Sequence, residues 1–241
     1  MWRNHYAGSL LTDIAAAFCT KVFCTSKHSY TAKYKKTVLM PVGVDLERFG
    51  DRELGGTAPN ARESMPGSIL FLARMAPSKR PEMLLEALAL LQQKGVLFTA
   101  AFVGSPLPEH REFYERLKER ARAQDPHSQI SFLQGIPNTE APAVFRRYEI
   151  FVNASRSGMF DKTLFEAAAS GCFVLASSED FRDSAGIQQY FSNANELADR
   201  LIFALARTDD DWVRDRTHML MLARKENLAT LADRLVYELN S

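Results

Sequence analysis

Short apolar segments alternate with longer amphipathic ones through the middle of the chain. The short segments have five to seven residues and span 68–73, 97–103, 129–133, 149–153 and 172–176. Such runs are typical of strands that are buried on both faces of a sheet. Strands that alternate with helices in this way predict a parallel sheet covered by helices on both faces. The fold class is therefore α/β, with a Rossmann-like sheet.

Leucines at helical spacing mark the helices between and after these strands. The set at Leu84, Leu85, Leu88 and Leu91 predicts a helix that ends at Gly95. Further helices are predicted at about 109–123, 139–147 and 163–170. Two more sets predict a helical C-terminal third, namely Leu197, Leu201 and Leu205, then Leu228, Leu231, Leu235 and Leu239.

The first 60 or so residues have too few elements to close a core of their own. They predict a helix at 9–18, a strand at 21–25, a helix after Ser26 and a strand at 38–40. The stretch 52–67 is rich in Gly, Pro and polar residues, which is typical of a linker. We therefore predict three parts. They are a remnant of one α/β domain with its junction at 1–50, a linker at 51–67, and a complete Rossmann-like domain with C-terminal helices at 68–241.

Composition narrows the class of protein. Hydrophobic residues make up 46% and charged residues 24% of the chain, which is ordinary for a soluble globular protein. The net charge of +1 argues against a nucleic-acid partner. No apolar run approaches the roughly 18 residues of a membrane span, although peripheral membrane contact stays open. The three cysteines form no framework, so we expect a cytoplasmic protein.

Common catalytic signatures are absent from the sequence. There is no G-x-G-x-x-G, no P-loop lysine motif, no G-x-S-x-G and no H-E-x-x-H, and the five histidines have no metal-ligand spacing. The run Asp209–Asp211 contains D-x-D, but it precedes a helical segment and is better explained as helix N-capping. We therefore predict no metal site and no cofactor.

The loops after the predicted strands hold the candidate chemistry, because parallel sheets bind ligands beyond the carboxyl ends of their strands. Arg74 and Lys79 lie in the loop after the first strand of the complete domain. Two cations there can neutralise a diphosphate, but a solvated basic loop explains them equally well.

The loop 153–166 is the richest. It leads into a helix whose start, Thr163-x-x-Glu166, matches a capping box, in which Glu166 satisfies only backbone donors. The functional alternative uses the same geometry: the helix N-terminus faces a phosphate, and the Glu166 carboxylate accepts hydrogen bonds from a ribose diol. The residues alone leave both interpretations open.

Five segments carry a family resemblance, in order along the chain: FLARMAPSKRPEMLLEALALL, FVGSP, ISFLQGIP, EIFVNASRS and TLFEAAASGCFVLAS. Together they resemble the C-terminal, donor-binding domain of retaining glycosyltransferases with the GT-B fold, the glycosyl transferases group 1 family. The segment VLMPVGVD at 38–45 resembles the family's P-N-G-V-D junction between its two domains, with Val42 in place of Asn.

The resemblance implies a role for each matching residue. Arg74 and Lys79 would hold the donor diphosphate, together with backbone at Lys162, Thr163 and Leu164. Glu166 matches the second glutamate of the family's E-x7-E motif and would bind the ribose. Gly135, Ile136 and Pro137 would lie beside the base.

The sequence also departs from the family pattern. Gly158 stands where the first glutamate of E-x7-E contacts the donor sugar, and Asp161 or Lys162 could supply replacement contacts. Most of the N-terminal, acceptor-side domain has no counterpart in the chain, so the catalytic residues are unknown.

The resemblance implies transfer of a sugar from a nucleotide diphosphate donor, with retention of configuration, to an unknown glycan, lipid or small-molecule acceptor. No metal is expected to be required. This chain would supply the donor site and would be weakly active or inactive alone. Two alternatives stay open: a non-catalytic nucleotide-sugar-binding or assembly subunit, and a sugar-nucleotide epimerase.

Overall fold

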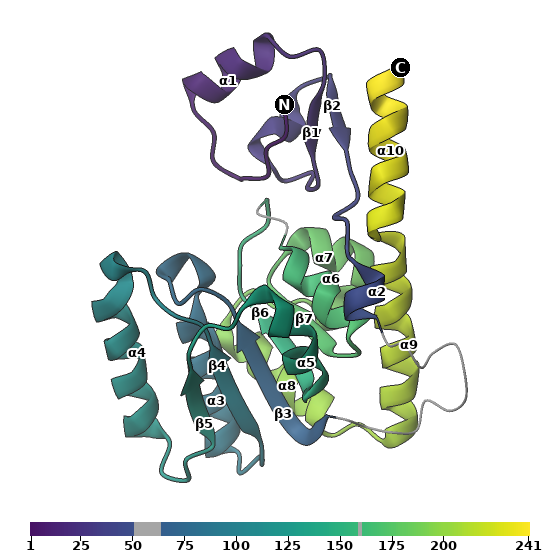
Figure 1. The fold of residues 1–241 in the computed structure, drawn as a ribbon. Helices are drawn as coiled ribbons and strands as arrows, with labels where there is room; N and C mark the ends of the chain where they lie inside the picture. Colours follow the sequence, from purple (N-terminus) through teal and green to yellow (C-terminus); the bar gives the residue numbers. More distant parts are fainter. Residues whose placement is uncertain (51–63, 159–160) are drawn as a thin grey trace.

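A parallel five-stranded sheet forms the centre of the protein. In this computed structural model, residues 1–50, 64–158 and 161–241 are described. The strand order is β5-β4-β3-β6-β7, and all neighbours pair in parallel (Figure 1). The strands are β3 (Met65–Leu72), β4 (Thr99–Val103), β5 (Ile130–Leu133), β6 (Tyr148–Asn153) and β7 (Phe173–Ala176).

Helices cover both faces of this sheet. Alternation along β3 sends Ile69 and Phe71 to one face and Leu70 to the other, and all three are buried. The first face packs against α3 (Pro81–Gln93), α4 (Arg111–Gln124) and α8 (Ala194–Leu205). The second packs against α2 (Leu46–Phe49), α5 (Ala141–Arg146), α6 (Lys162–Ala169), α7 (Glu179–Ala185) and α9 (Asp209–Lys225). The predicted α/β sheet with two covered faces is confirmed.

The N-terminal residues form a small unit, which we call the N-terminal unit (residues 1–40). It holds α1 (Leu10–Ala17) and the parallel pair β1 (Val22–Cys24) and β2 (Thr37–Leu39). Figure 1 shows it apart from the main sheet, beside the final helix α10 (Leu228–Asn240). Lys21 Nζ ties the two together by donating to the Glu238 carboxylate at 3.1 Å.

The chain enters the main domain along the junction between α9 and α10. The Gly43 and Val44 amides donate to the Glu226 carbonyl at 2.9 and 2.8 Å, and the Val42 amide donates to the Glu226 carboxylate at 2.9 Å. The segment that resembles the family's domain junction is therefore held by the C-terminal helices. It does not hang free.

Some predicted boundaries were wrong. β3 begins at Met65, inside the predicted linker 51–67, whose residues 51–63 lie outside the described part. β4 begins at Thr99 rather than residue 97. The helix expected after Ser26 is a single 3₁₀ turn at Tyr30–Lys33. The side chains of Ser26 and Ser29 bond to Asp180 on α7 and to the Arg3 carbonyl, so neither caps a helix here.

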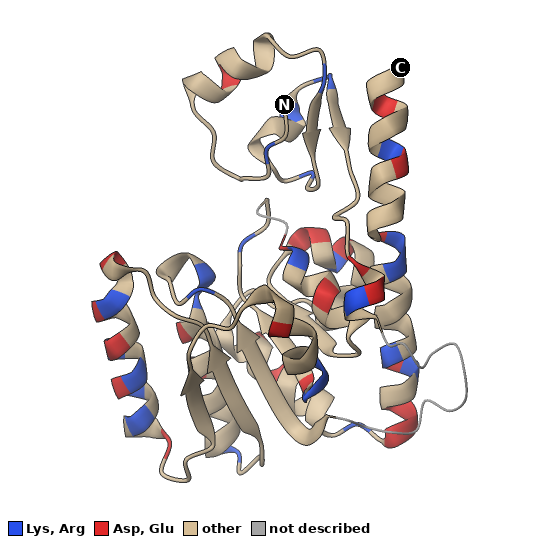
Figure 2. Ribbon diagram, viewed as in Figure 1, with Lys and Arg blue, Asp and Glu red and all other residues tan. Residues whose placement is uncertain are grey.

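Charge is distributed unevenly over the helices (Figure 2). Charged side chains line α4, whereas α1 carries one, Asp13. In the described part of the chain, no helix is long and apolar enough to cross a bilayer.

Candidate functional site

A hollow of about 330 Å³ lies at the carboxyl edge of the sheet, over the ends of β3 and β4. We call it the Glu166 hollow. Its lining includes five of the predicted site residues, namely Arg74, Gly135, Ile136, Thr163 and Glu166. The other lining residues are Leu72, Ala73, Val103, Gly104, Ser105, Asn138, Ala141 and Phe145. The topology thus brings Arg74 and Glu166, which are 92 positions apart in sequence, to the same hollow.

Two glycines shape the floor of this hollow. Gly104 has φ +154°, and a Cβ there would lie 1.8 Å from the Ala73 carbonyl oxygen, so only glycine fits between the loops. The Gly135 amide donates to Ser105 Oγ at 3.0 Å and ties the loop after β5 to the loop after β4. We did not single out Gly104 and Ser105 from the sequence, although the segment FVGSP contained the signal.

The start of α6 differs from the predicted capping box. The N-cap is Asp161, whose Oδ1 accepts from the Thr163 amide at 3.2 Å and from the Thr163 hydroxyl at 2.7 Å. Thr163 is therefore inside the helix, and Glu166 lies too far along to reach the cap. The capping interpretation of Glu166 was wrong, because Asp161, two residues before Thr163, is the N-cap of the helix.

Glu166 holds a buried carboxylate at the wall of the hollow. Its side chain is 6% exposed, and its partner in the described structure is Lys162, whose Nζ lies 4.0 Å away. Burial raises the pKa of Glu166, and the nearby Lys162 charge offsets this only in part. A carboxylate that is buried and weakly partnered can accept hydrogen bonds from a ligand that enters the hollow.

The two predicted cations differ in their surroundings. Arg74 is exposed, lines the hollow, and has no ion pair among the described residues. Lys79 Nζ instead donates to Asp161 Oδ2 at 2.9 Å and to Ser155 Oγ at 3.2 Å. Asn153 donates to the same Asp161 oxygen at 3.0 Å. Burial works against the Asp161 charge, but Lys79, Asn153 and Thr163 together lower the pKa of Asp161 below its ordinary value.

Three other predicted residues do not line the hollow. Leu164 is fully buried in the core between α6 and the sheet. Lys162 is about half exposed and is not part of the lining, although its Nζ lies 4.0 Å from the Glu166 carboxylate. Pro137 is not part of the lining. It precedes the 3₁₀ turn Asn138–Glu140, and Asn138 lines the hollow in its place.

Gly158 lies against the N-terminal unit. Its φ is +82°, and a Cβ there would meet the His28 carbonyl oxygen at 2.6 Å and Tyr6 Cβ at 2.8 Å. The position therefore leaves no space for the glutamate of the family motif. Instead of a glutamate side chain, the loop after β6 packs closely against the N-terminal unit at this position.

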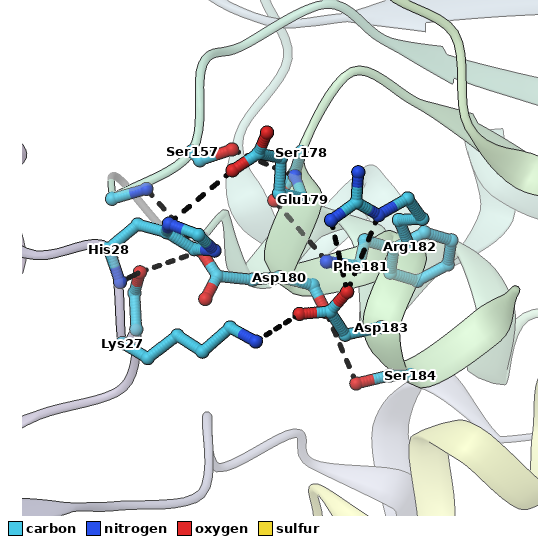
Figure 3. Close-up of polar contacts among 12 residues, drawn as sticks. Lys27, His28, Ser157, Ser178, Glu179, Asp180, Phe181, Arg182, Asp183 and Ser184 are labelled. Atoms are coloured by element: carbon cyan, nitrogen blue, oxygen red, sulfur yellow. Dashed lines mark hydrogen bonds and ion pairs between the residues drawn. The ribbon is translucent and has the colours of Figure 1, made fainter. Parts of the chain in front are cut away.

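A network of polar contacts joins the same surfaces (Figure 3). Ser26 donates to the Asp180 carboxylate at 2.6 Å, Lys27 pairs with Asp183, and His28 Nδ1 lies 3.4 Å from Glu179. All three partners are on α7. This helix therefore anchors the N-terminal unit beside the edge of the sheet that carries the loops.

A parallel sheet with helices on both faces and a hollow at its carboxyl edge is the architecture of Rossmann-like domains in GT-B glycosyltransferases. The sequence profile of the family described as glycosyl transferases group 1 matches residues 66–207. The chain belongs to this family.

Relatives and solved structures agree with this assignment. The D-inositol 3-phosphate glycosyltransferase of Salinispora tropica is 28% identical over 160 residues, and that of Geodermatophilus obscurus is 30% identical over 158. Each alignment covers 62% of this chain and about a third of the relative, 33% and 34% respectively. The chain thus spans only part of the relatives that it matches.

Two solved structures show the same fold. Anabaena Alr3699/HepE, in complex with UDP and glucose, superposes with a TM-score of 0.79 at 17% identity, over 96% of this chain and 66% of that one. The C-terminal domain of a glycosyl transferase group 1 family protein, LpcC from Francisella tularensis, has a TM-score of 0.61 at 23% identity. That match covers 76% of this chain and 98% of the LpcC domain.

Proposed function

We propose that this chain supplies the nucleotide-sugar donor site of a retaining glycosyltransferase, and that the Glu166 hollow binds the nucleotide. The observation that carries the proposal is that one hollow holds the buried, weakly partnered carboxylate of Glu166 and the guanidinium of Arg74, which makes no ion pair with any described residue. A ribose diol can donate two hydrogen bonds to Glu166. Arg74 can form a bidentate contact with a diphosphate.

The chemical task of the site is electrostatic. The donor bond breaks as the anomeric carbon becomes oxocarbenium-like, and negative charge builds on the departing diphosphate. Arg74 would stabilise that charge directly. Lys79 would contribute less to diphosphate binding than we expected from the sequence, because its charge is already paired with Asp161. Asp161 also caps α6, so the helix N-terminus offers a weaker anion site than an uncapped one would.

The base would lie on the Gly135–Ile136 side of the hollow, against apolar surface from Ala141 and Phe145. UDP is bound in the HepE structure that shares this fold, and we propose a nucleoside diphosphate of this kind as the donor's leaving group.

Transfer assays separate this proposal from its two alternatives. Positioning two reactants contributes roughly 7–11 kcal/mol to lowering a barrier, and it needs protein on both sides of the cleft. We therefore expect residues 1–241 to bind nucleotide, as a thermal shift would show, and to transfer sugar slowly to a panel of acceptors. Turnover at about 1 per second or faster would contradict the idea that the chain is incomplete alone.

Product analysis distinguishes the rivals. An epimerase would convert the donor sugar without any acceptor, which chromatography of the nucleotide sugars would reveal. A binding or assembly subunit would bind the donor but produce neither transfer nor hydrolysis when a partner chain is supplied.

A further inference from the structure

A second hollow, of about 340 Å³, lies beyond the ends of β6 and β7 and does not include any residue of the Glu166 hollow. Two arginines contribute to its wall, and we call it the two-arginine hollow. Its lining comprises Tyr6, Arg80, Arg156, Ser157, Ser177, Glu179, Tyr190 and Ser192. Five of these eight side chains carry a hydroxyl group and two carry a guanidinium group.

Arg80 lies in this wall with a strained backbone conformation. Its backbone adopts a left-handed conformation, with φ 50° and ψ 49°, which is uncommon for a residue with a side chain. Its Nε donates to the Ala154 carbonyl at 2.7 Å, and its Nη2 donates to Ser177 Oγ. These contacts come from the loops after β6 and β7, so the guanidinium is fixed between three loops.

Arg80 makes no ion pair in the described structure, and the carboxylate of Glu82 offsets its charge only at longer range. Burial lowers the pKa of Arg80, and the charge of Arg156 lowers it further. Arg156 is exposed and likewise makes no ion pair among the described residues. The acid in the wall is Glu179, whose carboxylate lies 3.4 Å from His28 Nδ1. The Glu179 backbone amide donates to Ser157 Oγ at 2.8 Å.

The charges of Arg80 and Arg156 repel each other, and a bound anion would relieve that repulsion. Guanidinium groups with adjacent hydroxyls are the donors that phosphate recognition favours. We infer that the two-arginine hollow binds a phosphate group, either as free phosphate or as a phosphate monoester on a sugar. This inference does not depend on nucleotide binding in the Glu166 hollow.

The test is a titration of residues 1–241 with inorganic phosphate, followed through the backbone amide signals of Ser157, Ser177 and Ser192. We expect binding in the millimolar range. The variant Arg156→Ala should weaken it about tenfold or more, because one charge-assisted contact is lost. Arg156 is exposed, so its removal leaves the core intact, and a thermal melt would confirm that the variant is folded.

Two control variants locate the anion. Arg122→Ala removes an exposed arginine on α4, far from the hollow in sequence, and should leave phosphate binding unchanged. Arg74→Ala removes the cation of the Glu166 hollow and any phosphate bound there, whereas the signals of Ser157, Ser177 and Ser192 should still respond to phosphate. A second titration with glucose 1-phosphate distinguishes the sources: tighter binding than inorganic phosphate indicates a sugar phosphate, and equal or weaker binding indicates the free anion.

Three results would overturn the inference. The first is that wild-type protein shows no signal changes with phosphate at tens of millimolar. The second is that Arg156→Ala binds phosphate as wild type does. The third is that Arg74→Ala abolishes binding, which would place the anion in the Glu166 hollow.

Discussion

Glu166 is a buried carboxyl group, and burial disfavours its charged form. Its side chain is 6% exposed, and the cation that pairs with it among the described residues, Lys162, lies 4.0 Å away. Buried polar groups are normally satisfied within the protein, and exceptions point to function. The residue is better explained by a ligand than by the stability of the free protein, since it plays no part in capping α6.

Replacing Glu166 by Gln should therefore have opposite effects on binding and on stability. Nucleoside diphosphate affinity should fall by about 30–150-fold, or about 2–3 kcal/mol, through loss of charge-assisted bonds to the ribose. The melting temperature of the free protein should rise at pH 7, because a buried charge is removed. Calorimetry and thermal melts check the two effects.

The pH dependence follows from the raised pKa of Glu166. A raised pKa means that folding favours the protonated form, so the cost of the charge is present at neutral pH and disappears as pH falls through that pKa. The stability advantage of Glu166→Gln should shrink on acidification. An advantage that grows instead, or unchanged nucleotide affinity, would contradict the assignment.

At the scale of the element, the start of α6 depends on one residue. Asp161 caps the helix, pairs with Lys79 at 2.9 Å, and accepts from Asn153 at 3.0 Å. The helix carries Thr163 and Glu166 into the hollow, so the cap also sets the geometry of the site.

Variants of Asp161 separate its two roles. Asp161→Asn keeps a good N-cap but loses the ion pair, whereas Asp161→Ala loses both and should cost about 0.5–2 kcal/mol more in the free energy of unfolding. Because the pKa of Asp161 is lowered, the ion pair stabilises the protein above the ordinary aspartate pKa and is lost as pH falls through the lower, folded-state value.

The difference between wild type and Asp161→Asn should therefore narrow in acid, as urea titrations at several pH values would show. Asp45 is the matched control, since it caps α2 through the Arg48 amide at 3.2 Å without a comparable ion pair in the described structure. If Asp45→Asn and Asp161→Asn lose equal stability, the ion pair contributes nothing.

A substitution at Gly158 tests how closely the loop after β6 packs against the N-terminal unit. Gly158→Ala adds a methyl group 2.6 Å from the His28 carbonyl oxygen at a positive φ, so we expect it to destabilise the protein by about 1–3 kcal/mol. Gly95→Ala is the control, because Gly95 has φ +69° and no atom within 4 Å of the added Cβ. Chemical denaturation of both variants separates packing from backbone strain; equal losses would mean that the contact with His28 is unimportant.

Much of the element pattern was predictable from sequence, because buried strands and leucine-faced helices leave a strong periodicity. The position of Arg74 and Glu166 at one edge of the sheet followed from the rule that parallel strands present their loops at one edge. The strand order was not predicted, because it depends on long-range pairing that the periodicity does not encode. The pairing of Lys79 with Asp161 was not predictable, since a competing cap and a counterion 82 positions away leave no local signal. The role of Gly158 in packing against residue 28 was hidden for the same reason.

At the scale of the whole molecule, the N-terminal unit leaves apolar surface uncovered. On and beside α1, Leu10, Leu11 and Phe18 are 74%, 76% and 88% exposed. Exposed apolar patches of this kind mark interaction surfaces. Figure 2 shows that α1 carries little charge, which makes this surface more apolar.

We therefore expect residues 1–241 to self-associate, and the double variant Leu11→Glu with Phe18→Glu to reduce the association. Sedimentation velocity over a range of concentrations measures this directly. Leu97→Glu serves as the control, because Leu97 is 84% exposed but lies far from α1 in the main domain. A monomeric wild-type protein, or an equal effect of the control, would show that the α1 surface does not drive association.

The most direct test of the proposed donor site is a calorimetric comparison of UDP and uridine binding to wild type and to Arg74→Ala. Arg74 faces the Glu166 hollow without an ion pair among the described residues, so its charge is available to a diphosphate. We predict a loss of about 10–100-fold in UDP affinity, a fall in wild-type UDP affinity with added salt, and almost unchanged uridine binding. Wild-type affinity for UDP in Arg74→Ala, or equal losses for both ligands, would contradict the account.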